Sequence, residues 1–352
     1  MRRRRDSADR GGAPAHLARA ALLVGLAALG SGCRDDARAG PTAAASSGAA
    51  AGEPSAEPSS TGEAGPADAG LDAAPPEDAA PPPPPERRCP LDMVRVDRRY
   101  CVDRYEAMLV AKGTEELRLS PYYSPTRKWA LYAVKEWQKG RLDIGDAKAR
   151  AMPLPNLPDW QRERDVAPVA LSRKGVTPNG HTSGVEAKAA CENAGKRLCT
   201  FEEWRLACGG ERRLKYPYGD KYEQGACNVF REAHPAAVLH DNPAIGHNDP
   251  RLNLVESKGK PLLRKTGATP RCKSEWEGDA AYDMVGNVDE WFEGDPSGGF
   301  GGGFYARATK EGCDWYTTKH PFPYADYSLG VRCCADLLPP GVAPAAGRDG
   351  DE

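Results

Sequence analysis

Ten of the eleven cysteines lie between residues 89 and 334, and this concentration constrains the fold more than any other feature of the chain. In an exported domain, an even number of cysteines is typical of a disulfide framework. Spacing alone does not select the pairs. No C-x-x-C motif occurs, so the sequence supports neither a zinc ribbon nor a thioredoxin-type redox site.

Two helices are expected in the cysteine-rich stretch 190–210 and just before it. The S-x-x-E spacing at 183–186 and the T-x-x-E spacing at 200–203 are those of capping boxes at helix N-termini. Cys191 and Cys208 then fall on the apolar faces of these helices. Buried thiols on apolar faces are usually inert or disulfide-bonded, because a nucleophilic thiolate needs an accessible, electropositive setting.

The N-terminus resembles a bacterial lipoprotein signal. Arg2–Arg5 precede an apolar segment at 18–30 and the sequence Ser31-Gly32-Cys33. This order predicts a signal peptide over residues 1–32 and a lipid on the sulfur of Cys33. We therefore expect a membrane-anchored lipoprotein of the bacterial cell envelope. An ordinary secretory signal, which would give a secreted protein, is the alternative.

Composition divides the rest of the chain. Residues 33–88 are rich in Ala, Pro, Gly and Ser and cannot bury enough apolar surface to fold, so we expect a disordered tether. Residues 89–336 have the length of one large domain, and residues 337–352 read as a disordered polar tail. The net charge of −2 gives no reason to expect nucleic-acid binding.

Periodicity within the domain indicates an α+β fold with low regular secondary structure. Residues 128–139 carry Trp129, Tyr132 and Trp137 at near-helical spacing, which predicts a helix. Apolar residues alternate between Cys89 and Cys101, which predicts a hairpin clamped at its base by a disulfide. Gly, Pro, Asn and Asp are frequent beyond residue 209, so we expect short strands and much ordered loop there.

Five motifs follow one another along the domain in the order AGKRLCTFEEWRLACGG, YPYGD, CNVF, YDMVGNVDEW and YSLGVRCC. The domain resembles the formylglycine-generating enzyme family, also called the sulfatase-modifying-factor domain, most clearly from residue 183 onward. That resemblance implies a disulfide-rich α+β domain with a C-type-lectin-like fold.

The resemblance also implies disulfide pairs. Vertebrate members of the family pair cysteines at matching spacings, which suggests the bonds Cys191–Cys333 and Cys208–Cys313. The cysteines that remain allow Cys227–Cys272 and Cys199–Cys334 as plausible pairs.

The chemistry of the family depends on a different cysteine pair. In catalytic members, two cysteines separated by four residues follow an R-G-G-S stretch, bind copper and oxidise a substrate cysteine to formylglycine. The corresponding stretch here, GGGFYARATKEG at 301–312, contains no cysteine. Copper(I) selects soft thiolate ligands, so we expect no copper site. Cys313 is a weak candidate for a lone catalytic thiol.

Calcium is the better-supported ligand, because it takes six to eight oxygen atoms from carboxylates and backbone carbonyls. By resemblance to calcium-binding members, one site uses the side chains of Asp283 and Glu290 with the carbonyls of Gly286 and Val288. A second uses Asn228, the Val229 carbonyl and, loosely aligned, Asp241. These residues could equally be turn-forming and capping residues. The four histidines at 181, 234, 240 and 247 have loop-like spacing, so we interpret them as solvated or hydrogen-bonded.

Two functions remain. The favoured one is a non-catalytic, calcium-stabilised binding module with a lectin-like surface for an unknown protein or glycan ligand. The alternative is a formylglycine-generating oxidase or a related protein-modifying enzyme with a rebuilt active site.

Overall fold

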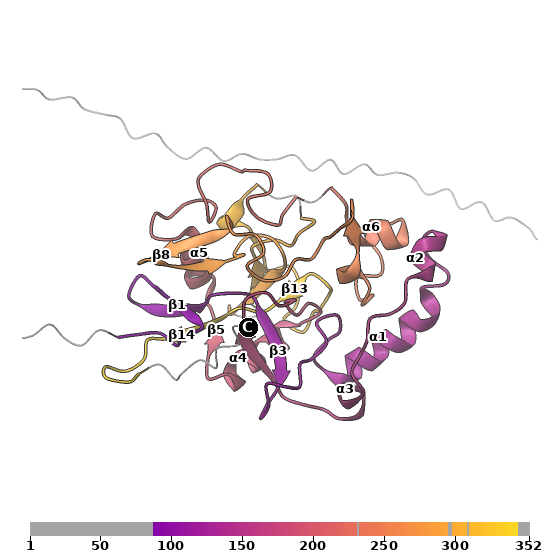
Figure 1. The fold of residues 1–352 in the computed structure, drawn as a ribbon, viewed down its shortest axis with the longest axis horizontal. Helices are drawn as coiled ribbons and strands as arrows, with labels where there is room; N and C mark the ends of the chain where they lie inside the picture. Colours follow the sequence, from indigo (N-terminus) through magenta and orange to yellow (C-terminus); the bar gives the residue numbers. More distant parts are fainter. Residues whose placement is uncertain (1–86, 231, 295–297, 308–309, 344–352) are drawn as a thin grey trace, which may run out of the picture. The chain divides into compact units, whose positions relative to one another are not determined.

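The computed structural model describes residues 87–343, apart from residue 231 and residues 295–297 and 308–309. The signal and tether predicted over residues 1–32 and 33–88 lie outside this range, except for residues 87 and 88. Helices and strands mix along the described chain, as an α+β fold requires (Figure 1).

The helices of this part of the chain are short. They are α1 (Arg127–Gly140), α2 (Ala147–Ala151), α3 (Asp159–Glu163), α4 (Gly184–Asn193), α5 (Phe201–Gly209) and α6 (Pro235–His240), with 3-10 turns η1 (Leu252–Leu254) and η2 (Gly312–Asp314). Both predicted capping boxes are present at the starts of α4 and α5. Gly195, with φ of 72°, follows the C-terminus of α4 and adopts the left-handed conformation expected of a helix-ending glycine.

The strands form several small sheets. They are β1 (Met93–Val96), β2 (Tyr100–Asp103), β3 (Ala107–Ala111), β4 (Pro168–Ser172), β5 (Arg197–Leu198), β6 (Glu256–Ser257), β7 (Lys260–Pro261), β8 (Lys273–Trp276), β9 (Asp279–Tyr282), β10 (Asp289–Phe292), β11 (Gly299–Gly301), β12 (Tyr316–Thr317), β13 (Leu329–Gly330) and β14 (Cys333–Asp336). One four-stranded sheet has the order β1-β2-β14-β5 and another has the order β12-β11-β10-β13. The pairs β3-β4, β6-β7 and β8-β9 form two-stranded sheets.

The predicted hairpin is confirmed as β1 and β2, which pair antiparallel from Met93 opposite Asp103 to Val96 opposite Tyr100. The C-terminal strand β14 then pairs antiparallel with β2, so the two ends of the domain share one sheet. Leu337, which the sequence assigned to the tail, is buried with Cys101 and Met93. Packing therefore continues slightly beyond residue 336.

The predicted helix at 128–139 is confirmed as α1, but its apolar stripe is divided. Ala130, Ala133 and Trp137 are buried, whereas Trp129 and Tyr132 are 54% and 49% exposed. No helix among the described residues is both long enough and apolar enough to cross a bilayer.

Two hydrophobic clusters meet at β14. Cys334 belongs to the cluster around Trp204 and Trp276, and Cys333 belongs to the cluster around Trp291 and Leu329. Successive side chains of a strand point to opposite faces, so adjacent cysteines reach different clusters. Disulfides from Cys333 to Cys191 and from Cys334 to Cys199 tie both clusters to one strand.

We predict that the two disulfides of β14 partly duplicate each other, because each restricts nearly the same part of the unfolded chain. While one of the two bonds remains, the other closes a loop of only about ten residues, and losing it lowers the free energy of unfolding by about 3 kcal/mol. When the second bond is lost as well, the smallest remaining loop runs through the Cys208–Cys313 bond and has about 40 residues. Losing that second bond therefore lowers the free energy of unfolding by about 4 kcal/mol. Urea unfolding of Cys191→Ala/Cys333→Ala, of Cys199→Ala/Cys334→Ala and of the four-fold variant should show a combined loss about 1 kcal/mol larger than the sum. Additive or sub-additive losses would contradict this interpretation.

Candidate functional site

All ten cysteines of the described residues are paired. The bonds are Cys89–Cys101, Cys191–Cys333, Cys199–Cys334, Cys208–Cys313 and Cys227–Cys272. They join the same residues as the hairpin and the family resemblance indicated. Cys313, the weak candidate for a catalytic thiol, is bonded to Cys208 and carries no free thiol here. Cys33 lies outside the described residues.

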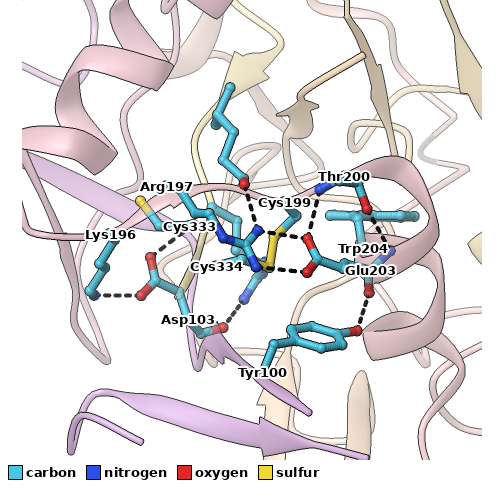
Figure 2. The surroundings of a disulfide bond; sticks show 12 residues. Tyr100, Asp103, Lys196, Arg197, Cys199, Thr200, Glu203, Trp204, Cys333 and Cys334 are labelled. Atoms are coloured by element: carbon cyan, nitrogen blue, oxygen red, sulfur yellow. Dashed lines mark hydrogen bonds and ion pairs between the residues drawn. A yellow bond between two sulfur atoms is a disulfide. The ribbon is translucent and has the colours of Figure 1, made fainter. Parts of the chain in front are cut away.

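Hydrogen bonds and ion pairs surround the Cys199–Cys334 disulfide (Figure 2). The fully buried Asp103 accepts hydrogen bonds from the Cys333 backbone N–H at 3.0 Å and from Lys196 Nζ at 2.6 Å. Arg197 forms a two-pronged ion pair with Glu203, the residue that also caps α5. These bonds fix β5, α5 and β14 around the disulfide.

Arg307 lies within the stretch 301–312, where the family resemblance places the reacting cysteines. Its Nη2 donates to Asp289 Oδ2 at 2.8 Å. Its guanidinium carbon lies 4.1 Å from the ring centre of Trp315 and 5.0 Å from that of Phe304. A guanidinium held over aromatic faces and paired with a carboxylate is fixed by both contacts.

Asp289 begins β10 and is fully buried. Burial raises the pKa of its carboxyl group to about 7, although Arg307 opposes the shift. Its Oδ1 has no hydrogen-bond partner among the described residues. The stretch 301–312 therefore contributes the guanidinium of Arg307 to a buried ion pair with Asp289 of β10. A guanidinium cannot ligate copper(I) as thiolates do.

Hydrogen-bonded polar groups adjoin this ion pair. Tyr327 Oη lies 3.2 Å from His234 Nε2, and burial lowers the pKa of His234. Asp326 accepts hydrogen bonds from the backbone N–H and hydroxyl of Ser328 and from the hydroxyl of Tyr324. His234 Nδ1 has no hydrogen-bond partner among the described residues, so this group of side chains is only partly satisfied.

Asp283 and Glu290, the predicted side chains of the first calcium site, are both buried and already bonded. Glu290 accepts from Arg332 Nε at 2.9 and 2.8 Å and from Trp204 Nε1 at 2.7 Å. Asp283 accepts from the Gly267 N–H at 2.6 Å. Gly286 and Val288 lie in the turn between them, where Gly286 has φ of 88°. No cluster of three ligand-type side chains suited to a metal occurs among the described residues.

Glu106 joins this turn from a distant part of the chain, and no motif in the sequence pointed to it. It accepts from Asn287 Nδ2 at 2.6 Å and from the Val288 N–H at 3.1 Å. Burial, followed by the charges of Asp283 and Glu290, raises the pKa of Glu106 well above its ordinary value. Burial likewise raises the pKa of Asp283, to about 6. Three buried carboxyl groups thus lie near Arg332, and the charge of Arg264 also lowers the pKa of Asp283. Carboxylate oxygens grouped in this way are chemically suited to calcium.

The second predicted calcium site is not assembled. Asn228 is buried, and its Oδ1 has no partner among the described residues, which suits a cation ligand. Asp241 instead ends α6 at the exposed surface, and no hydrogen bond in the described part joins it to Asn228. The residue next to Asn228, Val229, is buried in the cluster around Trp204.

The four histidines were predicted to be solvated or hydrogen-bonded, and two of them are buried instead of solvated. His181 and His240 are buried, and His240 stacks on Trp137 with ring centres 5.0 Å apart. His247 Nε2 lies 2.8 Å from the Pro243 carbonyl oxygen, as a hydrogen-bonded loop histidine would.

Comparison with known proteins matches residues 101–299, more than half of the chain, to the family described as "Sulfatase-modifying factor enzyme 1-like domain". A bovine protein, "Inactive C-alpha-formylglycine-generating enzyme 2", is 31% identical over 116 residues, covering 32% of each chain. The "Formylglycine-generating enzyme" of Thermomonospora curvata is 30% identical over 118 residues, again covering 32% of each chain. The chain thus matches about a third of the length of these relatives.

Among solved structures, the "Major Tropism Determinant P3c Variant" matches with a TM-score of 0.36 and 14% identity. The match covers 72% of this chain and 55% of that one.

We predict that Arg307→Met lowers the free energy of unfolding by about 2–3 kcal/mol, because it leaves the Asp289 carboxylate buried without its partner. The loss falls below that of a fully buried pair, since the Arg307 side chain is 29% exposed. Adding Asp289→Asn should recover at least half of it. Arg205→Met, which breaks the exposed pair with Asp314, is the matched control and should change stability little. Equal losses for Arg307→Met and Arg205→Met in urea unfolding would show that the buried pair has no special role.

Proposed function

The chain belongs to the sulfatase-modifying factor enzyme 1-like family, and we propose that its folded part is a binding domain that does not form formylglycine. The proposal concerns the described residues, since the chain matches only about a third of its curated relatives' length.

The state of the cysteines carries this proposal. Copper-dependent oxidation of a substrate thiol requires soft thiolate ligands with an open coordination position. Among residues 87–343, every cysteine is in a disulfide, and the stretch matching the reactive pair holds Arg307 bound to Asp289. The name of the bovine relative, which describes that protein as inactive, agrees with a family that includes non-catalytic members.

The test is an oxidation assay with a peptide that carries the sulfatase cysteine motif. We predict that the purified protein leaves the peptide unchanged in mass after long incubation with copper and oxygen. The same peptide, treated with an active member of the family, is the positive control. Conversion of the cysteine to an aldehyde would falsify the proposal, and its loss in Cys313→Ala would identify the sulfur responsible.

We further propose that calcium stabilises the turn from Asp283 to Glu290. The support is the group of three buried carboxyl groups, Glu106, Asp283 and Glu290. Burial and the neighbouring carboxylates raise the pKa of Glu106 and of Asp283, although Arg332 and Arg264 oppose the shifts. The Asp283 and Glu290 side chains and the carbonyl oxygens of Gly286 and Val288 would hold the ion, and Glu290 would share its carboxylate between the ion and Arg332. A divalent cation there would offset the charge that burial leaves uncompensated.

Chelation should therefore lower the melting temperature. A ligand that binds only the folded state stabilises it by about 2.7 kcal/mol at a hundredfold excess over its Kd. Asp283→Ala should remove the difference between melts with calcium and with chelator, whereas Asp143→Ala, at an exposed carboxylate outside the turn, should preserve it. A wild-type melt that is the same with calcium and with chelator would rule the site out.

Export and lipid attachment at Cys33 are part of the same proposal. The support is the order of the basic, apolar and small residues before Cys33, together with a domain whose cysteines form five disulfides. Disulfides of this density are typical of proteins in oxidising compartments outside the cytoplasm.

A further inference from the structure

A cavity of about 320 Å³ lies between α1, the start of α4 and the segment around residue 324. Its volume is at the lower end of small-molecule sites, which span about 300–1,000 Å³. Four aromatic side chains line it: Tyr123, Trp129, Tyr132 and Tyr324. None of them belongs to the stretch 301–312 or to the turn from Asp283 to Glu290.

The exposure of two of these rings is unusual for the helix that carries them. Trp129 and Tyr132 lie one helical turn apart on α1, with ring centres 6.0 Å apart in an edge-to-face arrangement. About half of each side chain is exposed, although Ala133 and Trp137 of the same helix are buried. The helix therefore holds two aromatic side chains at the cavity without burying them in the core.

Most of the hydroxyl and carboxylate groups that line the cavity already have hydrogen-bond partners. The Tyr123 hydroxyl donates to the Pro155 carbonyl at 2.8 Å, and the Tyr324 hydroxyl donates to Asp326 at 2.7 Å. Glu186 accepts hydrogen bonds from the hydroxyls of Ser124 and Ser183. A sugar, which needs many free donors and acceptors, would find few here. Tyr324 stacks on His320 with ring centres 4.2 Å apart, which covers one of its faces, whereas Trp129 and Tyr132 are half-exposed.

The charges around the cavity favour a positive ligand. Glu186 is the only ionisable carboxylate lining the described cavity, and no lysine or arginine lines it. His181 also lines it, is 5% exposed and has an unpartnered Nε2. Burial lowers the pKa of His181 to about 4 despite the opposing charges of Asp326, Asp249 and Glu186, so its ring is neutral at pH 7 and does not repel a cation.

We propose that this aromatic cavity binds a quaternary ammonium group of a small molecule, an inference that builds on the proposed binding role. Aromatic faces attract such cations through the ring quadrupole, and several rings with a nearby carboxylate form the cage typical of choline recognition. The Trp129 ring already attracts one cation, since Lys128 Nζ lies 5.0 Å from its centre, and the ligand would displace this lysine or use the opposite face of the ring.

The test is a calorimetric titration of the full chain with choline and with its neutral carbon isostere, dimethylbutanol. We expect choline to bind and the isostere to bind at least about tenfold more weakly, because the contribution depends on charge. Trp129→Leu and Tyr132→Leu should each weaken choline binding by about tenfold. Tyr132→Phe, which keeps the ring, should bind like wild type.

Tyr316→Leu, which removes another half-exposed ring away from the cavity, is the matched control and should leave the affinity unchanged. Equal affinity for choline and the isostere, no binding of either, or binding of simple sugars instead would each overturn the inference. These results are separate from the peptide assay. Failure to bind choline with an unmodified peptide overturns only the inference, whereas an oxidised peptide overturns the proposed function whatever the titration shows.

Discussion

The rest of the fold depends on the two disulfides that leave adjacent residues of β14. Cys333 is bonded to Cys191 on α4, and Cys334 is bonded to Cys199 just before α5. Because neighbouring side chains of a strand point to opposite faces, one strand joins both large hydrophobic clusters. A domain with strands of two to five residues has few long ladders to hold it, so these covalent ties compensate for limited regular structure.

The disulfides also bear on the proposed function, because they occupy the cysteines of the domain. A cysteine that closes a loop cannot also serve as a copper ligand, since the ligand is the thiolate. Where the family resemblance places reactive sulfur, this chain has Arg307, fixed by Asp289 and stacked on Trp315. A charge pair of this kind stabilises one arrangement of the loop.

Local signals in the sequence predicted local structure well. The capping boxes before α4 and α5, the hairpin β1-β2 and the helix α1 all depend on residues within a few positions of one another. Contacts between residues far apart in the sequence could not be predicted from these local signals. Glu106 accepts a hydrogen bond from Asn287 at a separation of 181 residues, and Arg332 pairs with Glu290 at a separation of 42 residues. The helical spacing of Trp129 and Tyr132 could not reveal that both face a cavity, because exposure depends on what packs against α1.

The hairpin pattern predicted the bond Cys89–Cys101, but the long-range pairs were predictable only through family resemblance, since spacing leaves many combinations open. The central claim is that every domain cysteine is structural, and counting thiols tests it most directly. The protein is unfolded without reductant, treated with an alkylating reagent and mapped by peptide mass spectrometry. We predict no alkylation at any of the ten cysteines from Cys89 to Cys334, with full alkylation after reduction. Alkylation of two or more of them in the unreduced protein would contradict the claim.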